Sequence, residues 1–256
     1  MNDTFDPTGH EFAQWLTRVE RNQSHPNQRW RDASTLILVD RSEAMPKVLL
    51  GRRHARHKFL PGRFVFPGGR VERVDGGMPV ATPLHPADEA RLLKGVRQPS
   101  PAKARAFALA AIRETFEETG LLIGRRQDEP AGSVKTDKAG KPATLYDQHR
   151  VYPDLAAMHF IARAITPPGR PRRYDTRFFA ADVTAVAHRV DGVVGPDAEL
   201  VELVWLPIAE VERLEMTTIT KVALKELEAR SAAGFGHDLP VPFYRMLHRR
   251  FVREAL

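Results

Sequence analysis

Two patterns of apolar and polar residues alternate along this 256-residue chain. Apolar residues that recur every three or four positions predict helices, and short runs of β-branched and aromatic residues predict strands. Helices are expected at 10–22, 88–96, 101–119, 207–215 and 219–230, and strands at 33–40, 47–52, 64–66, 155–166, 176–183 and 200–206. Short strands scattered among helices predict a fold of mixed α and β structure.

The longest predicted helix has clear signals at both of its ends. Ser100 is a favourable N-cap, Pro101 suits the first helical position, and Gly120 suits the residue that follows the helix. Residues 125–150 are polar and without a period, so we interpret them as a long loop. The elements on either side of this helix are therefore expected to be joined by irregular segments.

The amino-acid composition excludes several classes of protein. Hydrophobic residues make up 42% of the chain and charged residues 28%, which is enough apolar content for a folded core. The chain has no cysteine, so disulfide scaffolds, thiolate zinc sites, iron–sulfur clusters and cysteine nucleophiles are excluded. Its ten histidines show no metal-ligand spacing. Any metal ion is therefore expected to bind oxygen ligands.

The net charge of +7 and the pI near 9.9 favour anionic partners such as phosphates and nucleotides. The first residues do not combine a basic start with an apolar run, as a signal peptide would, and no stretch approaches the ~20 apolar residues of a membrane span. We therefore expect a cytoplasmic protein without a membrane partner.

Three carboxylates fall on one face at the end of the longest helix. Glu114, Glu117 and Glu118 are spaced for one helical face, which we expect to be the exposed one. The opposite face carries Leu109, Ile112 and Phe116. Acidic residues are unfavourable in the last turn, and Arg113 offsets this only in part by pairing with Glu117. The pattern is typical of a Mg²⁺ or Mn²⁺ site, although an ordinary charged helix end remains the alternative.

The same segment resembles a known family. Residues 113–120 (RETFEETG) resemble the helix of the Nudix box, and residues 66–69 (FPGG) resemble its glycine turn. The resemblance covers residues 31–230 and implies a Nudix-type α/β/α sandwich around a mixed β-sheet. Residues 1–30 are then an N-terminal helical extension and residues 231–256 a C-terminal extension.

The chain departs from the family pattern between the glycine turn and the helix. Asp75 stands where the family has a glutamate, and the segment from there to Arg113 is much longer than in the family. We interpret residues 76–100 as an insertion that stays outside the central sheet. Whether Asp75, Asp88 or Glu89 replaces the usual glutamate is left open.

The resemblance also implies roles for individual residues. Glu114, Glu117 and Glu118 would bind the metal together with the backbone carbonyl of Gly69, and Arg113 would orient the carboxylates. Gly68 would let the backbone approach the phosphates closely. The general base is either a glutamate of the box or an acid from a later loop. The candidates in that loop are Asp197, Glu199 and Glu202, of which Glu199 is our choice.

A second set of residues resembles the coenzyme A diphosphatase branch of the family. Leu49, Leu50, Arg53 and Gly62 stand at the spacing of its signature before the FPGG turn, whereas Gly51, His54 and Lys58 depart from it. The basic run around them is expected to bind phosphates, with Arg53, Lys58 and Arg63 as substrate-binding residues. Another basic cluster is formed by Arg170, Arg172, Arg173 and Arg177.

These residues lead to one main hypothesis and two alternatives. We expect a pyrophosphohydrolase that uses Mg²⁺ or Mn²⁺ to cleave the diphosphate of a nucleoside diphosphate linked to another group, with CoA or acyl-CoA as substrate. The alternatives are an ADP-ribose or NADH pyrophosphatase and a non-catalytic nucleotide sensor or RNA-binding module. Nucleic acid is not the expected partner, because no aromatic stacking motif accompanies the basic clusters. Homodimer formation is left open.

Overall fold

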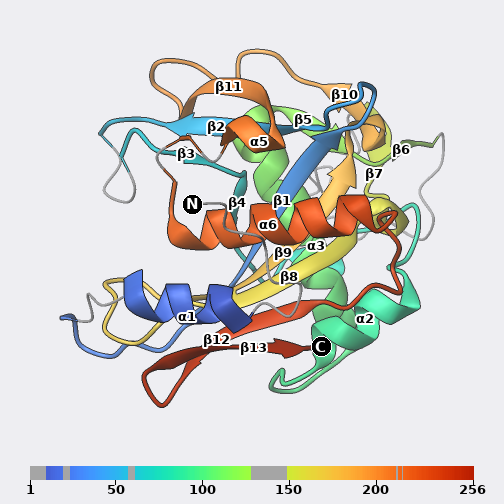
Figure 1. Ribbon diagram of the computed structural model, residues 1–256. Coiled ribbons are helices and arrows are strands. Elements are labelled where there is room, and N and C mark those ends of the chain that lie inside the picture. Colours follow the sequence, from blue (N-terminus) through green and yellow to red (C-terminus); the bar gives the residue numbers. More distant parts are fainter. Residues whose placement is uncertain (1–9, 20–23, 57–60, 128–148, 212, 215) are drawn as a thin grey trace.

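The computed structural model describes residues 10–19, 24–56, 61–127, 149–211, 213–214 and 216–256 (Figure 1). Its helices are α1 (His10–Val19), α2 (Pro86–Leu93), α3 (Pro101–Thr119), α5 (Ile208–Val211) and α6 (Thr218–Ala232), with 3₁₀ turns η1 (Asp75–Gly77), η2 (Leu155–Ala157) and η3 (Val183–Ala185). Its strands are β1 (Arg31–Asp40), β2 (Lys47–Arg53), β3 (Phe64–Val65), β4 (Gly68–Arg70), β5 (Leu121–Ile123), β6 (Arg125–Arg126), β7 (Val151–Tyr152), β8 (His159–Ile165), β9 (Tyr174–Asp182), β10 (Val186–Arg189), β11 (Leu200–Pro207), β12 (Pro242–Leu247) and β13 (Arg250–Ala255).

A large mixed sheet forms the centre of the protein. Its strands follow the order β11-β2-β1-β9-β8-β12-β13, with β3 paired to β2 and β4 paired to β1. The pairs β1–β9 and β8–β12 are parallel, and the other pairs in this sheet are antiparallel. Two small sheets, β5–β10 and β6–β7, accompany it. The predicted mixed α and β fold is confirmed.

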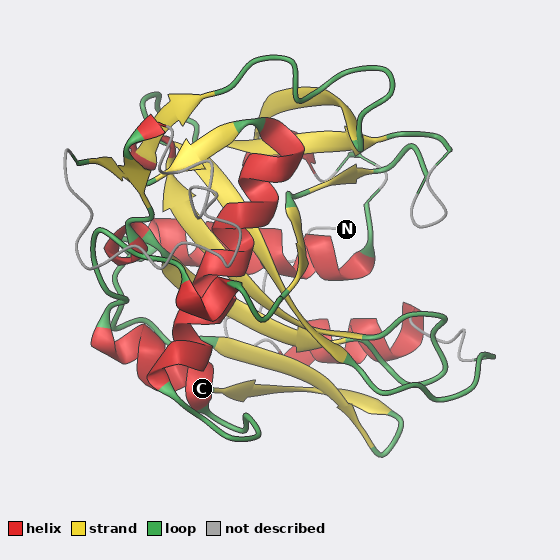
Figure 2. Cartoon of the chain, turned by 180° about the vertical axis from the view of Figure 1, so that it is seen from behind, coloured by secondary structure: helices red, strands yellow, loops and turns green. Residues whose placement is uncertain are grey.

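Helices cover both faces of this sheet. Figure 1 shows α1 and α6 in front of the strands, and the reverse view in Figure 2 brings α3 to the front. Strand β1 serves both layers, because its successive side chains point to opposite faces. Leu36 and Leu38 belong to the core beneath α3, whereas Ile37 and Val39 belong to the core beneath α6. The result is the α/β/α sandwich that the resemblance implies.

Helix α3 begins and ends where its sequence predicts. The Ser100 side chain accepts a hydrogen bond from Lys103 N at 3.2 Å, and Pro101 is the first helical residue. Gly120 ends the helix with φ of 75°, a left-handed conformation that costs glycine little. The centre of α3 is fully buried against β1. This packing fixes which way its last two turns face.

Residues 76–100 leave the glycine turn and return to α3 without adding a strand to the central sheet, as expected. The helix within them, α2, begins two residues before the predicted start and is capped by the His85 side chain, which accepts a bond from Ala87 N at 3.3 Å. Leu84 and Leu92 bury this excursion against the α3 core. The insertion is therefore a packed part of the fold.

Several elements differ from the sequence-based expectation. The helix expected at 207–215 is described only as the short α5, and the expected loop at 125–150 begins with β6, while its residues 128–148 lie outside the described part. Strands β12 and β13 add a hairpin to the sheet after residue 231. The hairpin turn at His248 and Arg249 has positive φ angles of 46° and 65°. Neither residue is a glycine or an asparagine, the residue types from which such a turn is usually predicted.

Within the described residues, no helix combines the length and the apolar character that crossing a membrane requires. The division of the chain into residues 1–30, 31–230 and 231–256 stays a prediction.

Candidate active site

The last two turns of α3 bring two carboxylates against the glycine turn. Gly68 N donates a hydrogen bond to Glu118 Oε2 at 3.2 Å. A Cβ atom placed on Gly69 would clash with the Glu114 carboxylate, so this carboxylate lies so close to the backbone only because Gly69 has no side chain. Two of the three predicted carboxylate ligands therefore meet at the glycine turn.

This arrangement corrects the expectation that the three glutamates share an exposed face. Glu118 is only 6% exposed, because β4 lies against it, whereas the side chain of Glu117 is 52% exposed. The structure thus separates Glu117, on the outer side of the helix, from Glu114 and Glu118.

Arg113 links the carboxylates to the segment that precedes them. Its guanidinium donates to Glu114 Oε1 at 2.9 Å and to Glu117 Oε2 at 3.0 Å, and the second contact is the predicted pair. It also donates to the backbone oxygen of Arg70 at 2.9 Å and to Asp75 Oδ1 at 2.8 Å. One arginine therefore holds the glycine turn and the carboxylate helix together.

The three acids left open by the sequence differ in their contacts. Asp75 is fully buried, pairs with Arg113 and accepts a bond from Glu72 N at 2.7 Å. Asp88 lies elsewhere, where it accepts bonds from Phe160 N at 3.2 Å and pairs with His237 at 2.7 Å. Glu89 is next to it on α2. Asp75 is therefore the one of the three that contacts the candidate site.

The carboxylates carry more negative charge than their surroundings balance. Burial, followed by the nearby Glu199, raises the pKa of Glu118 to about 8, against the opposing effect of the Gly68 N–H. Burial also raises the pKa of Glu114, although Arg113 opposes the shift. Neighbouring carboxylates therefore make the charged forms of both Glu114 and Glu118 more costly, an effect that a bound cation would reverse.

The donor atoms gathered here fit a hard divalent cation. Glu114 and Glu118 supply carboxylate oxygens beside the backbone of Gly69 and Gly68. Across the described residues, no group of three or more His, Asp or Glu side chains is arranged to hold a metal ion. A metal held here would therefore use two carboxylates, backbone oxygen and groups from outside the chain.

Among the later acids, only Glu199 lines the same pocket. Glu199 Oε1 accepts a bond from Arg53 at 2.5 Å, and its charge is one of the causes of the raised pKa of Glu118. Glu202 instead pairs with Arg52 at 2.8 Å on the exposed side of β11. Asp197 is exposed. The choice of Glu199 over its neighbours agrees with this placement and stays a prediction as to its role.

Only some of the predicted phosphate-binding residues can be placed at the pocket. Arg63 and Gly68 line the pocket, and Arg53 lines it while paired to Glu199. Lys58 lies outside the described residues. The basic run is thus partly engaged with acids of β11.

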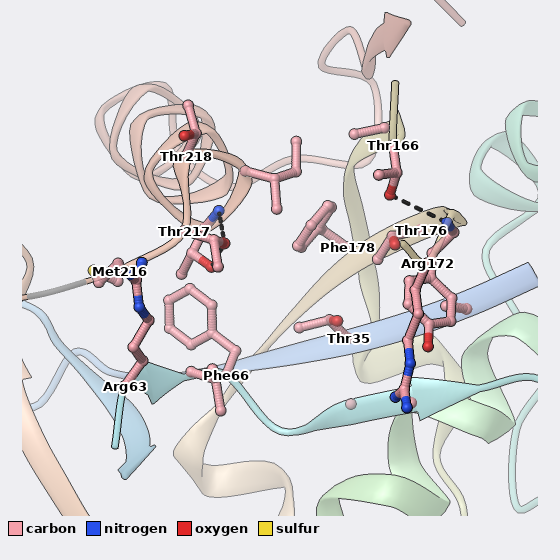
Figure 3. Close-up of a pocket in the computed structure, with 18 of the residues that line it drawn as sticks. Thr35, Arg63, Phe66, Thr166, Arg172, Thr176, Phe178, Met216, Thr217 and Thr218 are labelled. Carbon is pink, nitrogen blue, oxygen red and sulfur yellow. Dashed lines mark hydrogen bonds between the residues drawn. The ribbon is translucent and has the colours of Figure 1, made fainter. Parts of the chain in front are cut away.

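A pocket of about 860 Å³ extends from the glycine turn across the face of the sheet that α1 and α6 cover. Figure 3 shows Arg63 and Arg172 on opposite walls, with Thr35, Phe66 and Phe178 between them. Its lining also includes Leu16, Ile165, Met216, Ile219 and Phe251. A cavity of this size and mixed polarity suits a ligand as large as a dinucleotide.

Sequence reasoning did not find this pocket wall. Leu16 belongs to α1 and Phe251 to β13, and these segments meet where Phe251 N donates to Thr17 Oγ1 at 2.9 Å. No sequence signal indicates that residues so far apart share a wall, because the contact depends on how the sheet is completed. The sequence also offered no reason to divide the second basic cluster. In the structure, only Arg170 and Arg172 of its four arginines line the pocket.

The other two arginines of that cluster have structural contacts. Arg177 is 1% exposed and pairs with Asp32 at 2.7 Å. Arg173 donates to Asn27 Oδ1 and to the backbone oxygen of Gln28, each at 2.7 Å. These contacts hold β9 to the segment before β1.

Comparisons with known proteins agree with this geometry. Residues 30–219 match the family described as the NUDT19 Nudix domain. The chain is 30% identical over 208 residues to the acyl-coenzyme A diphosphatase NUDT19 of Gallus gallus, which covers 59% of this chain and 55% of that protein. It is 28% identical over 156 residues to the putative nudix hydrolase 7 of Caenorhabditis elegans, covering 59% of this chain and 43% of that protein. The chain spans about half the length of the curated relatives it matches.

A solved structure shares the fold. The crystal structure of a NUDIX hydrolase from Alicyclobacillus acidocaldarius is similar with a TM-score of 0.55 and 27% identity, covering 79% of this chain and 92% of that one. The region that matches the family contains the glycine turn, α3 and β11, which together carry the described carboxylates. The chain therefore belongs to the Nudix hydrolase family, in the group described by the NUDT19 Nudix domain.

Proposed function

We propose that this chain hydrolyses the diphosphate of CoA or acyl-CoA with the help of Mg²⁺ or Mn²⁺. One observation carries the proposal: the partly buried Glu114 and the buried Glu118 meet the glycine pair Gly68 and Gly69 at the end of a pocket of about 860 Å³. Such a place takes a cation together with phosphate oxygens, because both need close oxygen donors and an open backbone. The similarity to an acyl-coenzyme A diphosphatase supports CoA as the nucleotide.

The residues of the chain have distinct roles in this proposal. Glu114 and Glu118 hold the cation with the backbone carbonyl of Gly69, and Arg113 keeps the two carboxylates oriented through its bond to Glu114. When bound, the cation supplies charge neutralisation at the phosphate oxygens and a lower pKa for water. Glu117 lies on the outer side of the helix, where it accepts a bond from Arg113 and would act as a further ligand only from that side.

Proton transfer is assigned to Glu199. Water attacks one phosphorus of the diphosphate, the bond to the bridging oxygen breaks, and Glu199 accepts the proton that the water loses. Arg53, 2.5 Å from Glu199, orients that carboxylate before the attack. Arg63 and Gly68 bind the phosphates. The products from CoA are 3′,5′-ADP and 4′-phosphopantetheine.

The substrate is tested with a panel of diphosphates. CoA, acyl-CoA, dephospho-CoA, ADP-ribose and NADH are each incubated with the protein and Mg²⁺ or Mn²⁺, and the products are identified by mass spectrometry. We expect the highest kcat/KM for CoA or acyl-CoA and no turnover in excess chelator. Equal or better turnover of ADP-ribose would assign the protein to the dinucleotide alternative, and binding without turnover of any of them would assign it to the sensor alternative.

A further inference from the structure

The loop between β8 and β9 forms one wall of the pocket, on the far side from Arg63. Five of its residues line the cavity, namely Thr166, Pro167, Arg170, Pro171 and Arg172. Among these five, the charged ones are two arginines. Figure 3 shows Arg172 extending along this wall, with Phe66 and Phe178 between it and Arg63. The loop therefore presents positive charge to the cavity at a place where no acidic residue of the loop accompanies it.

This loop is held firmly in place. Arg173 donates to the backbone oxygen of Thr166 at 3.0 Å, which closes the loop on itself, and Thr166 Oγ1 accepts a bond from Tyr174 N at 3.1 Å. His25 N donates to the backbone oxygen of Gly169 at 3.0 Å, which ties the loop to the segment before β1. The two prolines restrict the backbone further. A loop fixed in this way holds its arginines beside the cavity before a ligand arrives, so little ordering entropy is lost on binding.

Two groups of charged residues stand out in the pocket lining, which also includes Arg53, Arg63, Arg70 and Glu72. The acidic residues Glu114, Glu118 and Glu199 lie around the glycine turn, where a cation would neutralise them. Arg170 and Arg172 lie on the loop wall. A ligand that matches both groups has a diphosphate at the glycine turn and a further anionic group beyond it. The apolar floor between the walls, with Phe66 and Phe178, accommodates a ring or a chain.

We infer that Arg170 and Arg172 form a second phosphate subsite, which binds the 3′-phosphate that distinguishes CoA from dephospho-CoA. The inference rests on the proposed function, because it concerns the same substrate. Guanidinium groups suit this role, since their planar donors bind phosphate oxygens in pairs. The contact is present in the ground state and in the transition state alike, so its loss raises KM and leaves kcat unchanged.

The test compares CoA with dephospho-CoA in the wild type and in the double variant Arg170→Ala/Arg172→Ala. We expect the wild type to prefer CoA in kcat/KM by about tenfold, the size of a charged hydrogen-bonded contact, and the double variant to lose this preference. The loss should come from a higher KM for CoA, with dephospho-CoA kinetics unchanged. The single variant Arg172→Lys should keep part of the CoA preference that the double variant loses, because lysine keeps the positive charge.

A binding measurement without metal gives an independent readout. With chelator present, calorimetry should show that 3′,5′-ADP binds the wild type about tenfold more tightly than it binds the double variant, while 5′-AMP binds both equally. The matched control is Arg189→Ala, an arginine with a 70% exposed side chain on β10 that does not line the pocket, and it should behave as the wild type in both measurements.

The outcomes separate the inference from the function on which it rests. A wild type that turns over ADP-ribose but not CoA overturns both, and this is seen before any variant is made. A wild type that hydrolyses CoA, combined with an unchanged CoA preference in the double variant, overturns the subsite alone. An equal loss for CoA and dephospho-CoA also overturns it, because the arginines would then act on a part that both substrates share.

Discussion

Charged side chains are buried at two places in this protein, one on β8 and β9 and the other beside β4. On β8 and β9, Arg163 makes two bonds of 2.7 and 2.8 Å with Asp175, and Arg177 lies between Asp175 and Asp32. Beside β4, Glu118 is buried with a backbone N–H and other carboxylates as its neighbours. The first cluster pairs each acid with an arginine. In the second, Arg113 pairs with Glu114 and Arg53 with Glu199, whereas the hydrogen bond described for Glu118 comes from the backbone N–H of Gly68.

The difference indicates what each cluster is for. A paired cluster tolerates burial because each charge is compensated, and it loses much of its value when one partner is removed. Carboxylates that raise one another's pKa give the folded chain no comparable benefit, so their arrangement is explained by something that binds there. The predictions below test whether stability and activity divide between the two clusters in this way.

The largest effect on stability is expected from Asp175→Ala. The change leaves Arg163 buried without its carboxylate partner, and removing one partner of a buried pair costs about 3–5 kcal/mol of unfolding free energy. Urea unfolding measures the loss. Asp191→Ala is the matched control, because its pair with Arg189 is exposed on both sides and should change stability by less than about 0.5 kcal/mol. Similar losses in both variants would contradict the role given to the buried cluster.

The largest effect on activity is expected from Glu118→Gln. It should lower kcat by about 10²-fold, the scale seen when one electrostatic element of a site is removed. The unfolding free energy should stay the same or rise, because burial disfavours the charged form of Glu118, as its raised pKa indicates, and an uncharged amide can still accept the Gly68 bond. Initial rates with Mg²⁺ and urea unfolding measure the two quantities.

Glu117→Gln sharpens the same comparison. Its side chain is half exposed and paired with Arg113, so we expect a decrease in kcat of about tenfold or less. If Glu117→Gln lowers the rate more than Glu118→Gln, the outer carboxylate is the main metal ligand and the geometry at the glycine turn is secondary.

Divalent cations should stabilise the second cluster alone. At a concentration about 100 times the Kd, Mg²⁺ or Mn²⁺ should raise the unfolding free energy of the wild type by about 2.7 kcal/mol through mass action. Asp175→Ala should show the same gain from its lower starting value, and Glu114→Gln/Glu118→Gln should show none. A gain that survives in the double glutamine variant would place the metal elsewhere. Thermal unfolding with and without chelator provides the measurement.

The smallest effect, a change in how stability depends on pH, is expected from a third cluster, which is formed by histidines and one buried acid. His237 stacks on His85 and on His159 with ring centroids 4.2 and 4.1 Å apart, and it pairs with the buried Asp88 at 2.7 Å. Burial, followed by the charges of His237 and Arg230, lowers the pKa of His159 to about 4. The rings thus favour a neutral His159.

This pKa gives a definite sign to the pH dependence. His159 is neutral when folded and binds a proton more readily when unfolded, so its contribution is complete above pH ~6.5 and is lost as the pH falls towards 4. Discounted for its partial exposure, the loss is about 1–2 kcal/mol. His159→Gln should flatten the difference in unfolding free energy between pH 7 and pH 4.5 relative to the wild type. An unchanged slope would exclude His159 as the titrating group.

The local features of the fold could be predicted from the sequence. Helix α3 was predicted with its bounds because Ser100, Pro101 and Gly120 are local signals, and β1, β2 and β11 because their composition is typical of strands. The hairpin of β12 and β13 was not predicted, because its turn uses non-glycine residues at positive φ and because β12 is held by its contact with β8. Signals confined to a few residues are readable, and pairings between distant segments are not.

The same distinction applies to the candidate site. The spacing of Glu114, Glu117 and Glu118 indicated the helix that carries the site, and Glu199 was selected from a group of three acids. The burial of Glu118 and the contact of Asp75 with Arg113 could not be predicted, because both depend on how β4 lies against α3. The division of the second basic cluster into pocket-lining and structural arginines depends likewise on the path of β9 and its preceding loop.

The contact between α1 and β13 has a consequence for how the chain folds. Thr17 accepts its bond from Phe251, 234 residues later, and both helix and strand line the pocket through Leu16 and Phe251. Contacts between segments this distant in sequence form late, because a large loop must close before they give any stabilisation. During synthesis the carboxylates and the glycine turn leave the ribosome well before β13 does. The nascent chain therefore assembles its acidic turn first and closes the wall of the pocket only as the last strand joins the sheet.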